Sequence, residues 1–338
     1  MSHDIINSDT QGIGVVVIGR NEGERLRRCL TSVCDSKSSI VYVDSGSTDD
    51  SINIAKNMSV NVVNLDMSLP FSAARARNAG VDRLTDLVPE FNYIQFVDGD
   101  CEVTDSWFAT ASQFLDENSN VAIVAGQLNE RFPEASIYNR LGDLEWNFSK
   151  PGDVDAVGGI FMVKTAVFKD ISGFNETVTA GEEPELCRRA MDAGWRIVRL
   201  DKDMAWHDLA MNSFGQWWPR QVRGGYGGLD VARRFGLKGF IRNSWRSRFW
   251  SAWLGVALIS SFLGYWLTTS LLIMLWALQY WRIALGTWRG GQTIKTSLAY
   301  AWFTMLSFWP QMLGQIYYVW DKLKGRHYRL IEYKKNNT

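Results

Sequence analysis

Short apolar runs alternate with segments of helical periodicity through the first 200 residues. Runs rich in Val, Ile and aromatic residues predict buried strands, at residues 13–18, 40–43, 60–65, 93–97, 121–125 and 195–200. Apolar residues at helical spacing lie between these runs, most clearly at residues 72–87, 105–115 and 181–193. Strands that alternate with helices predict right-handed βαβ units, an α/β fold and a mostly parallel sheet. Residues 127–155 show neither pattern and are predicted to be irregular.

Polar side chains gather where the predicted strands end. Asn21 and Glu22 follow the first strand, Asp44 ends the second, and Asp98-Gly99-Asp100 ends the fourth. Open α/β sheets bind ligands at such strand ends. Two carboxylates this close repel each other, and a divalent cation, Mg²⁺ or Mn²⁺, relieves the repulsion while also binding phosphate oxygens of a substrate. The alternative is a plain turn, because Asp and Gly are common turn residues.

Charge divides the chain into an acidic part and a basic part. Residues 1–219 carry 19 Lys and Arg against 33 Asp and Glu, whereas residues 220–338 carry 17 against 3, so the net charges are −14 and +14. The basic part also contains most of the tryptophans and the long apolar runs. This combination favours a membrane surface over nucleic acid as the partner.

The apolar run from Phe249 to Trp281 contains no charged residue in 33 positions. A single helix of that length would measure about 50 Å, too long for a hydrocarbon core of about 30 Å. The run therefore predicts a membrane hairpin over about 249–285 that turns near Gly264, with Arg246, Arg248, Arg282 and Arg289 on one side. The positive-inside rule makes that side cytosolic. The alternative is the buried helical core of a soluble protein.

The remaining segments complete a three-part organisation. Residues 1–219 are predicted to form the globular domain, and residues 220–248 a basic amphipathic segment next to the membrane. Residues 249–338 are predicted to form the membrane region. Within it, residues 298–320 are predicted to be an interfacial helix, followed by a basic tail. The polar residues 1–10 predict no signal peptide. Four scattered cysteines lack paired metal-ligand spacing and indicate a reducing cytosol.

Seven short motifs in this order resemble family 2 glycosyltransferases with a GT-A fold, over roughly residues 12–210. They are Asn21-Glu22, Asp44-Ser45-Gly46-Ser47-Thr48-Asp49, Arg77-Asn78-Ala79-Gly80, Asp98-Gly99-Asp100, Gly158-Gly159, Gly173-Phe174 and Glu182-Glu183-Pro184-Glu185-Leu186-Cys187. The resemblance implies an inverting transfer of a sugar from a nucleotide-sugar donor, with a UDP-sugar favoured.

The resemblance also implies roles for individual residues. Glu183 matches the family's catalytic base, although the usual Glu-Asp pair is Glu182-Glu183 here. Asp100 and His207 match metal ligands, and Asp98 lies by the ribose and the metal. The expected nucleotide-binding set is Asn21, Glu22, Asp44, Ser45, Arg77 and Asp98, with Asp44 at the base. The residues expected near the donor sugar or the acceptor are Gly158, Gly159, Glu182, Arg220 and Arg223.

One motif of the processive polymerases in this family is missing. The stretch Gln216 to Gly224 does not match Gln-x-x-Arg-Trp, which favours transfer of a single sugar.

The expected acceptor is a glycan linked to polyprenyl diphosphate at the inner membrane, in envelope or exopolysaccharide synthesis, with the catalytic domain in the cytosol. Transfer to a polyprenyl phosphate is an alternative. From other classes, a non-catalytic nucleotide-sugar-binding membrane subunit and a nucleotidyltransferase stay open, the latter weakened because Gly19-Arg20-Asn21-Glu22-Gly23 is a poor glycine-rich basic loop.

Overall fold

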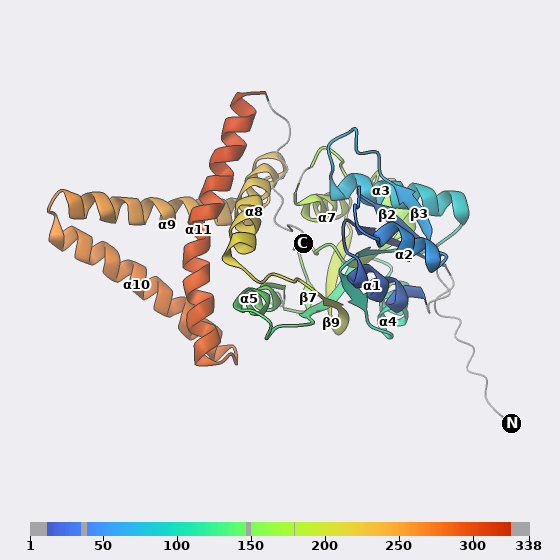
Figure 1. Ribbon diagram of the computed structural model, residues 1–338, viewed down its shortest axis with the longest axis horizontal. Coiled ribbons are helices and arrows are strands. Elements are labelled where there is room, and N and C mark those ends of the chain that lie inside the picture. The colour runs from blue at the N-terminus through green and yellow to red at the C-terminus, as the bar shows by residue number, and fades with distance from the viewer. Residues whose placement is uncertain (1–11, 35–38, 147–149, 179, 326–338) are drawn as a thin grey trace. The chain divides into compact units, whose positions relative to one another are not determined.

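The computed structural model describes residues 12–34, 39–146, 150–178 and 180–325 (Figure 1). The chain forms two compact units. The first contains residues 1–133 and 142–210, and the second contains residues 134–141 and 211–338. The first is a sheet with helices around it, and the second is helical.

A nine-stranded sheet forms the core of the first unit, in the order β3-β2-β1-β4-β8-β6-β9-β5, with β7 paired to β9. The strands are β1 (Ile13–Gly19), β2 (Ser39–Asp44), β3 (Asn61–Asn64), β4 (Tyr93–Asp98), β5 (Cys101–Val103), β6 (Val121–Glu130), β7 (Gly152–Asp153), β8 (Phe161–Lys164) and β9 (Arg196–His207). The helices are α1 (Glu24–Cys34), α2 (Ser51–Asn57), α3 (Ala73–Leu87), α4 (Trp107–Glu117), α5 (Ile137–Trp146), α6 (Thr165–Asp170) and α7 (Glu182–Asp192), of which α5 begins in the second unit.

The parallel half of the sheet confirms the four strands predicted first. Strands β3, β2, β1 and β4 pair in parallel, and helix α3 packs on β1 and β2. The side chains of β1 from Ile13 to Ile18 are buried because both faces of this sheet are covered. The register pairs Gly19 with Asp44 and Ile18 with Asp98, so the carboxyl ends of three strands meet at one edge.

The sheet is mixed, so the prediction of a mostly parallel sheet was wrong. Strand β8 is antiparallel to both β4 and β6, and the short strands β5 and β7 are antiparallel to β9. Strands of two or three residues have no apolar run from which sequence periodicity could predict them. The prediction of irregular structure over 127–155 was also wrong, since β6 extends to Glu130 and α5 covers Ile137–Trp146.

The second unit consists mainly of four helices: α8 (Phe214–Phe235), α9 (Lys238–Phe262), α10 (Trp266–Arg289) and α11 (Ile294–Leu323). Helix α11 packs against the other three (Figure 1). It crosses α8 at two glycines: a Cβ on Gly225 would lie 2.0 Å from the carbonyl oxygen of Gln311, and one on Gly314 would lie 2.1 Å from that of Val222. The backbones can approach this closely only because neither position has a side chain.

The hairpin turn predicted near Gly264 lies between α9 and α10, with Gly264 at φ 78°.

The expectation of membrane-spanning helices is not supported. Among the described residues, no helix combines the length and the apolarity needed to cross a bilayer. The first turns of α9 carry Lys238, Arg242, Arg246 and Arg248, and hydroxyl residues interrupt the apolar part of both helices. The expected basic segment 220–248 is divided between α8, most of which it covers, and the beginning of α9. The tail beyond residue 325 lies outside the described residues.

The crossing of α8 and α11 gives a direct test of this packing. Gly225→Ala is expected to destabilise the second unit by about 1–3 kcal/mol, because the added methyl meets rigid backbone. Gly224→Ala is the matched control on the same helix, where a Cβ would have no atom within 4 Å. It is expected to be neutral or stabilising by up to about 1 kcal/mol. Denaturant unfolding followed by tryptophan fluorescence measures both, and equal stability of the two variants would contradict the crossing.

Candidate active site

The carboxyl ends of β1 and β2 form the first part of the site. Asp44 is buried, and its Oδ1 accepts a hydrogen bond of 3.0 Å from the Tyr42 hydroxyl. Its Oδ2 accepts from the backbone N–H groups of Gly46 and Ser47, at 2.9 and 2.8 Å. Burial and the Asp44 carboxylate raise the pKa of Tyr42, which therefore remains a donor. A carboxylate has about four acceptor positions, so these three bonds leave room for one further N–H.

Asn21, in the loop after β1, forms hydrogen bonds with the loop after β2. Its backbone N–H donates to the Ser47 hydroxyl at 2.9 Å, and its side-chain oxygen accepts from the Thr48 N–H at 2.7 Å. Asn21 has φ 56°, a left-handed conformation that Asn tolerates better than most residues. The adjacent backbone N–H of Glu22 donates to the Ser51 hydroxyl at 3.1 Å, and its carboxylate pairs with Arg25 at 2.8 Å. These polar groups therefore shape the loops around Asp44.

A buried arginine joins three carboxylates from two other elements. Arg77 on α3 donates through Nη1 to Glu183 at 2.8 Å and to Glu182 at 3.3 Å, both in the first turn of α7. Its Nη2 donates to Oδ1 of Asp98, at the end of β4, at 3.1 Å. The guanidinium also lies over the ring of Phe174, with 5.4 Å between its central carbon and the ring centroid. The predicted base and the predicted ribose-side aspartate thus share one partner.

The charges of this cluster set its protonation. Burial alone would lower the pKa of Arg77, but the carboxylates of Glu183, Asp98 and Glu182 outweigh it and raise that pKa. Burial, and after it the negative charge of Glu182, raises the pKa of Glu183 to about 7 despite the opposing charge of Arg77. A carboxylate with a pKa near the working pH is suited to accept a proton during a reaction. The geometry and the pKa therefore both favour Glu183 as a base.

Gly159 allows these side chains to approach the backbone before β8. Its carbonyl oxygen accepts from Arg77 Nη2 at 3.4 Å. A Cβ at this position would lie 2.4 Å from Oδ2 of Asp98 and 2.7 Å from Nη2 of Arg77. At Gly158, a Cβ would have no atom within 4 Å. The paired glycines thus differ, and only Gly159 is required by close packing.

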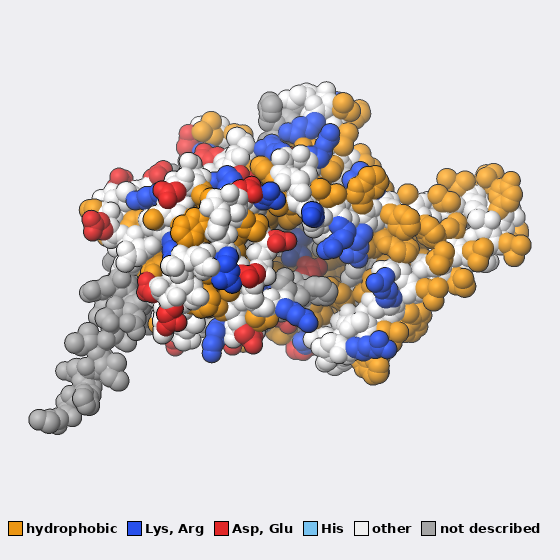
Figure 2. Space-filling view, turned by 180° about the vertical axis from the view of Figure 1, so that it is seen from behind, with side chains coloured by type: hydrophobic (Ala, Val, Ile, Leu, Met, Phe, Trp, Pro, Cys, Tyr) orange, Lys and Arg blue, Asp and Glu red, His pale blue; other side chains and the backbone are white. Residues whose placement is uncertain are grey.

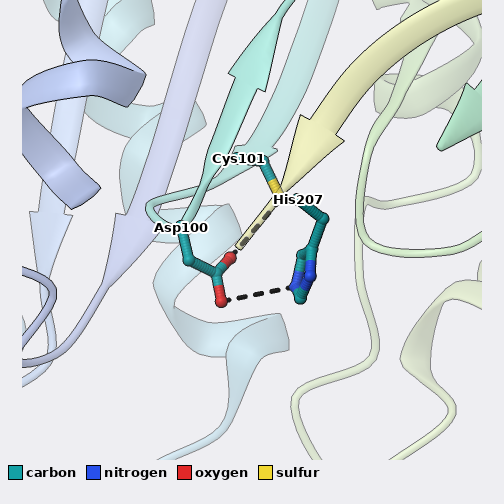
Figure 3. Close-up of side chains that lie close together, drawn as sticks. All are labelled: Asp100, Cys101 and His207. Carbon is teal, nitrogen blue, oxygen red and sulfur yellow. Dashed lines mark hydrogen bonds and ion pairs between the residues drawn. The ribbon is translucent and has the colours of Figure 1, made fainter. Parts of the chain in front are cut away.

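The side chains of Asp100 and His207 point toward each other (Figure 3). Oδ2 of Asp100 lies 3.4 Å from Nε2 of His207, which is the last residue of β9. The Cys101 thiol donates to Oδ1 of Asp100 at 3.4 Å. Ligand atoms of all three residues lie within 4.8 Å of one another. A carboxylate oxygen and an imidazole nitrogen suit a cation such as Mn²⁺, so these residues fit a divalent metal. Burial and the charges of Asp100 and Asp98 raise the pKa of the Cys101 thiol, so it is protonated in this arrangement.

An ion-pair network that sequence reasoning missed fixes the segments carrying Asp100 and His207. Arg28 on α1 pairs with Glu102 at 2.8 Å and with Asp208 at 2.7 Å. Glu102 lies on β5, two residues after Asp100, and Asp208 directly follows His207. The backbone N–H of Asp208 also donates to the carbonyl of Asp100 at 2.9 Å. In the sequence, Asp100 and His207 were the residues that indicated a site in this region.

Not every predicted site residue belongs to these groups. Ser45 is buried, and its N–H donates to the carbonyl of Gly19 at 3.0 Å, so it supports the loop. Asp98 is held by Arg77 and is not among the residues whose ligand atoms converge with Asp100. Arg220 and Arg223 lie on α8 in the second unit, and their role near a donor or acceptor stays a prediction.

Comparison with known proteins identifies the first unit. Residues 14–172 match the family model "Glycosyl transferase family 2", and residues 146–211 match "N-terminal domain of galactosyltransferase". The first unit is therefore similar to family 2 glycosyltransferases, and the chain is a glycosyltransferase. This family 2 match covers the β1, β2 and β4 loops, and the second match covers α7 and β9.

Curated relatives of this glycosyltransferase come from an archaeon and a bacterium. "Glycosyltransferase AglE" of Haloferax volcanii is 24% identical over 233 residues, which is 65% of this chain and 73% of AglE. "Pre-mycofactocin glycosyltransferase" of Mycobacterium tuberculosis is 27% identical over 203 residues, 55% of this chain and 40% of that protein. Both are glycosyltransferases by name, consistent with the family.

Solved structures confirm the GT-A type of fold. The mannosyltransferase PcManGT from Pyrobaculum calidifontis, in complex with GDP-Man and Mn²⁺, aligns with a TM-score of 0.57 at 15% identity, over 92% of this chain and 88% of that one. GalNAc-T7, with UDP, GalNAc and Mn²⁺, aligns with a TM-score of 0.52 at 15% identity, over 72% and 52%. At these identities the likeness establishes the fold of this glycosyltransferase alone.

The two glycines before β8 provide a matched test of the Arg77 cluster. Gly159→Ala is expected to lower sugar transfer at least about tenfold, because its methyl displaces Asp98 or Arg77 and a misplacement of about 1 Å is costly at a reacting centre. Gly158→Ala adds the same methyl one residue away in open space and is expected to retain more activity. Nucleoside-diphosphate release measures both, with thermal unfolding as the check on folding. An equal loss in both variants would contradict a specific need for glycine at 159.

Proposed function

We propose that this glycosyltransferase catalyses an inverting, metal-dependent transfer of one sugar from a nucleotide-sugar donor to a lipid-linked acceptor. The observation that carries the proposal is the Arg77 cluster, in which a base with a raised pKa shares a guanidinium with Asp98. The Asp100–His207 pair, one glycine beyond Asp98 in the chain, supports a cation at the same sheet edge. The base and the cation are the two groups such a transfer needs.

The chemical step follows from the position of Glu183. The acceptor hydroxyl attacks the anomeric carbon while the bond from that carbon to the diphosphate oxygen breaks. Glu183 takes the hydroxyl proton, and the nucleoside diphosphate leaves with the bonding electrons. One displacement of this kind inverts the anomeric configuration and needs no covalent sugar–enzyme intermediate. The carboxylates of Asp98 and Glu182 lie beside Arg77, where their negative charge favours the oxocarbenium character of the transition state.

Asp100 and His207 are the residues that would hold the cation, which would supply a positive charge to stabilise the departing diphosphate. The imidazole nitrogen favours Mn²⁺ over Mg²⁺, because Mg²⁺ prefers oxygen ligands. The complexes of PcManGT and GalNAc-T7 are named with Mn²⁺, which agrees with this choice. In this proposal Asp98 lies by the ribose, where Arg77 orients it.

Asp44 is proposed to recognise the donor base. Its position at the end of β2 and its one remaining acceptor site suit the imino N–H of a pyrimidine, which favours a UDP-sugar. Asn21, Glu22 and Ser45 shape the surrounding loops. Because PcManGT is named with GDP-Man, a GDP-sugar is the donor to test beside the UDP-sugars.

The acceptor and the location are proposed from the second unit. Large apolar side chains cover the α9–α10 hairpin (Figure 2), and Phe262 and Leu267 at its tip are 91% and 85% exposed. Monomeric soluble proteins rarely expose a patch of this extent. Arg246, Arg248, Arg282 and Arg289 lie in the parts of the two helices away from the tip. We place the hairpin in the cytosolic leaflet of the inner membrane, with a polyprenyl-linked acceptor at the same surface.

The pH dependence tests Glu183 as the base. Only the deprotonated carboxylate accepts a proton, so kcat/KM is expected to rise with pH, with a midpoint near the pKa of about 7, and to level off above it. Glu183→Gln is expected to lower the rate by about 10²–10⁴-fold. The assay is nucleoside-diphosphate release in the protein's own membranes, with a panel of UDP- and GDP-sugars and with Mn²⁺ or chelator.

Two further variants test whether the midpoint of the pH profile belongs to Glu183. Glu182→Gln removes the neighbouring charge that raises the pKa of Glu183, so the midpoint should move to lower pH. Glu183→Asp keeps a carboxylate and should retain more activity than the Gln variant. Full activity in Glu183→Gln would refute the base. Donor binding without release in wild type would favour the non-catalytic binding subunit.

Vesicle binding tests the hairpin. The full-length protein is expected to co-float with vesicles containing phosphatidylglycerol more than with pure phosphatidylcholine vesicles, because Arg residues accompany the apolar surface. Phe262→Asp with Leu267→Asp should weaken binding strongly, since each apolar side chain contributes about 1.5–3 kcal/mol on burial. Leu69→Asp, at a site that is 54% exposed in the first unit, is the matched control. Undiminished flotation of the double variant would exclude the tip as the contact.

A further inference from the structure

The side chain of His207 lies between two buried carboxylates. In the sheet, His207 on β9 is paired with Glu130 on β6 and with Cys101 on β5. Its Nε2 is 3.4 Å from Oδ2 of Asp100, and its Nδ1 is 3.7 Å from Oε2 of Glu130. The two ring nitrogens therefore face different acids.

Glu130 is fixed more firmly than an ordinary surface acid. Its side chain is fully buried, with 0% exposure. Oε1 accepts from the backbone N–H of Phe132 at 3.1 Å, and Oε2 accepts from that of Leu209 at 3.2 Å. Its own backbone N–H donates to Asp143 at 2.9 Å. These bonds keep a negative charge at a defined position behind the imidazole.

We propose that Glu130 is a positioning residue that selects the tautomer of His207. A neutral imidazole carries its proton on one nitrogen, and the other nitrogen has the lone pair that can bind a cation. The carboxylate of Glu130 stabilises the proton on Nδ1, and this leaves the lone pair of Nε2 directed toward Asp100. The distance of 3.7 Å exceeds a hydrogen bond, so the effect in this arrangement is electrostatic. The inference rests on the proposed metal-dependent function and concerns this same site.

The competition between the two acids makes Glu130 necessary. Asp100 by itself would favour the opposite tautomer, because a proton on Nε2 would face its carboxylate at 3.4 Å. That tautomer has no lone pair available for a cation beside Asp100. The ring of Trp146 contacts the imidazole edge-on, at 4.4 Å between centroids, and limits reorientation of the ring. Carboxylate partners of metal-binding histidines typically contribute 10–100-fold in metal affinity or activity.

Nitrogen NMR of the full-length protein tests the proposal before any cation is added. The chain has three histidines, so ¹⁵N-histidine labelling gives few side-chain signals, and His207→Gln identifies the one from His207. In wild type a measurable fraction of His207 should carry its proton on Nδ1, although Asp100 is the nearer acid. In Glu130→Gln the population should shift toward the proton on Nε2. Asp203→Asn is the matched control, since this exposed carboxylate on β9 bonds to Asn129 on β6 and does not face His207.

Binding of Mn²⁺ alone, followed by electron paramagnetic resonance, is the second measurement. Glu130→Gln is expected to weaken Mn²⁺ affinity about 10–100-fold, and saturating Mn²⁺ should recover most of the sugar transfer. Glu130→Asp keeps the charge and should weaken Mn²⁺ binding less. If the Gln variant does not fold, Mn²⁺ binding is measured on the Asp variant instead. An unchanged tautomer and unchanged Mn²⁺ affinity in a folded variant without the Glu130 carboxylate would overturn the proposal.

The two proposals fail in different ways. If wild type binds no Mn²⁺ and chelator does not slow transfer, the metal-dependent function fails, whatever the tautomer is. If wild type requires Mn²⁺ but Glu130→Gln alters only the unfolding temperature, Glu130 is structural and the function stands. If Asp203→Asn weakens Mn²⁺ binding as much as Glu130→Gln does, the effect is general to the β6–β9 pair, and the specific role of Glu130 is refuted.

Discussion

The contact of the buried Arg77 guanidinium with Glu183, Glu182 and Asp98 is the interaction on which the catalytic domain depends. Three carboxylates from α7 and the end of β4 could not lie this close without a cation, because their mutual repulsion is large where water is scarce. Removing one partner from such a group is costly, since it leaves charge unpaired. The same cluster leaves Glu183 with a raised pKa, so the contact that holds α7 near Asp98 also suits the proton acceptor proposed above.

The mixed sheet determines how the second acidic group forms. Strand β9 pairs in parallel with β6 and antiparallel with β5, which places His207 next to both strands. The pairing of β6 with β9 contains register shifts near Val121, Ala125 and Gln127. Because a slip of one residue turns side chains to the opposite face, these shifts decide that His207 meets Asp100 and Glu130. The Arg28 network with Glu102 and Asp208 then secures the same strand ends.

The second unit is held together by different interactions from those of the first. Its packing depends on glycines at the crossing of α8 with α11 and on buried polar contacts, such as Gln315 with Ser247 between α11 and α9. The apolar side chains of α9 and α10 are in large part exposed, although a soluble core would bury them. An acidic catalytic domain and a basic unit with an exposed apolar hairpin are consistent with donor chemistry and membrane contact residing in separate parts of one chain.

Local periodicity and turn chemistry were enough to predict the parallel strands, the strand ends at Asp44 and at Asp98-Gly99-Asp100, and the hairpin turn near Gly264. Through a family resemblance the sequence also predicted roles for Arg77, Glu183 and His207, and these roles stay predictions. The packed structure was needed to show that Arg77 links Glu183 to Asp98, that β5, β7 and β8 pair antiparallel to their neighbours, and that Glu130 lies near Nδ1 of His207. Glu130 ends a strand that carries no motif, and its partner lies far along the chain. Pairing between distant strands follows from register and bulges that emerge only when the whole sheet is packed, so no local pattern could reveal it.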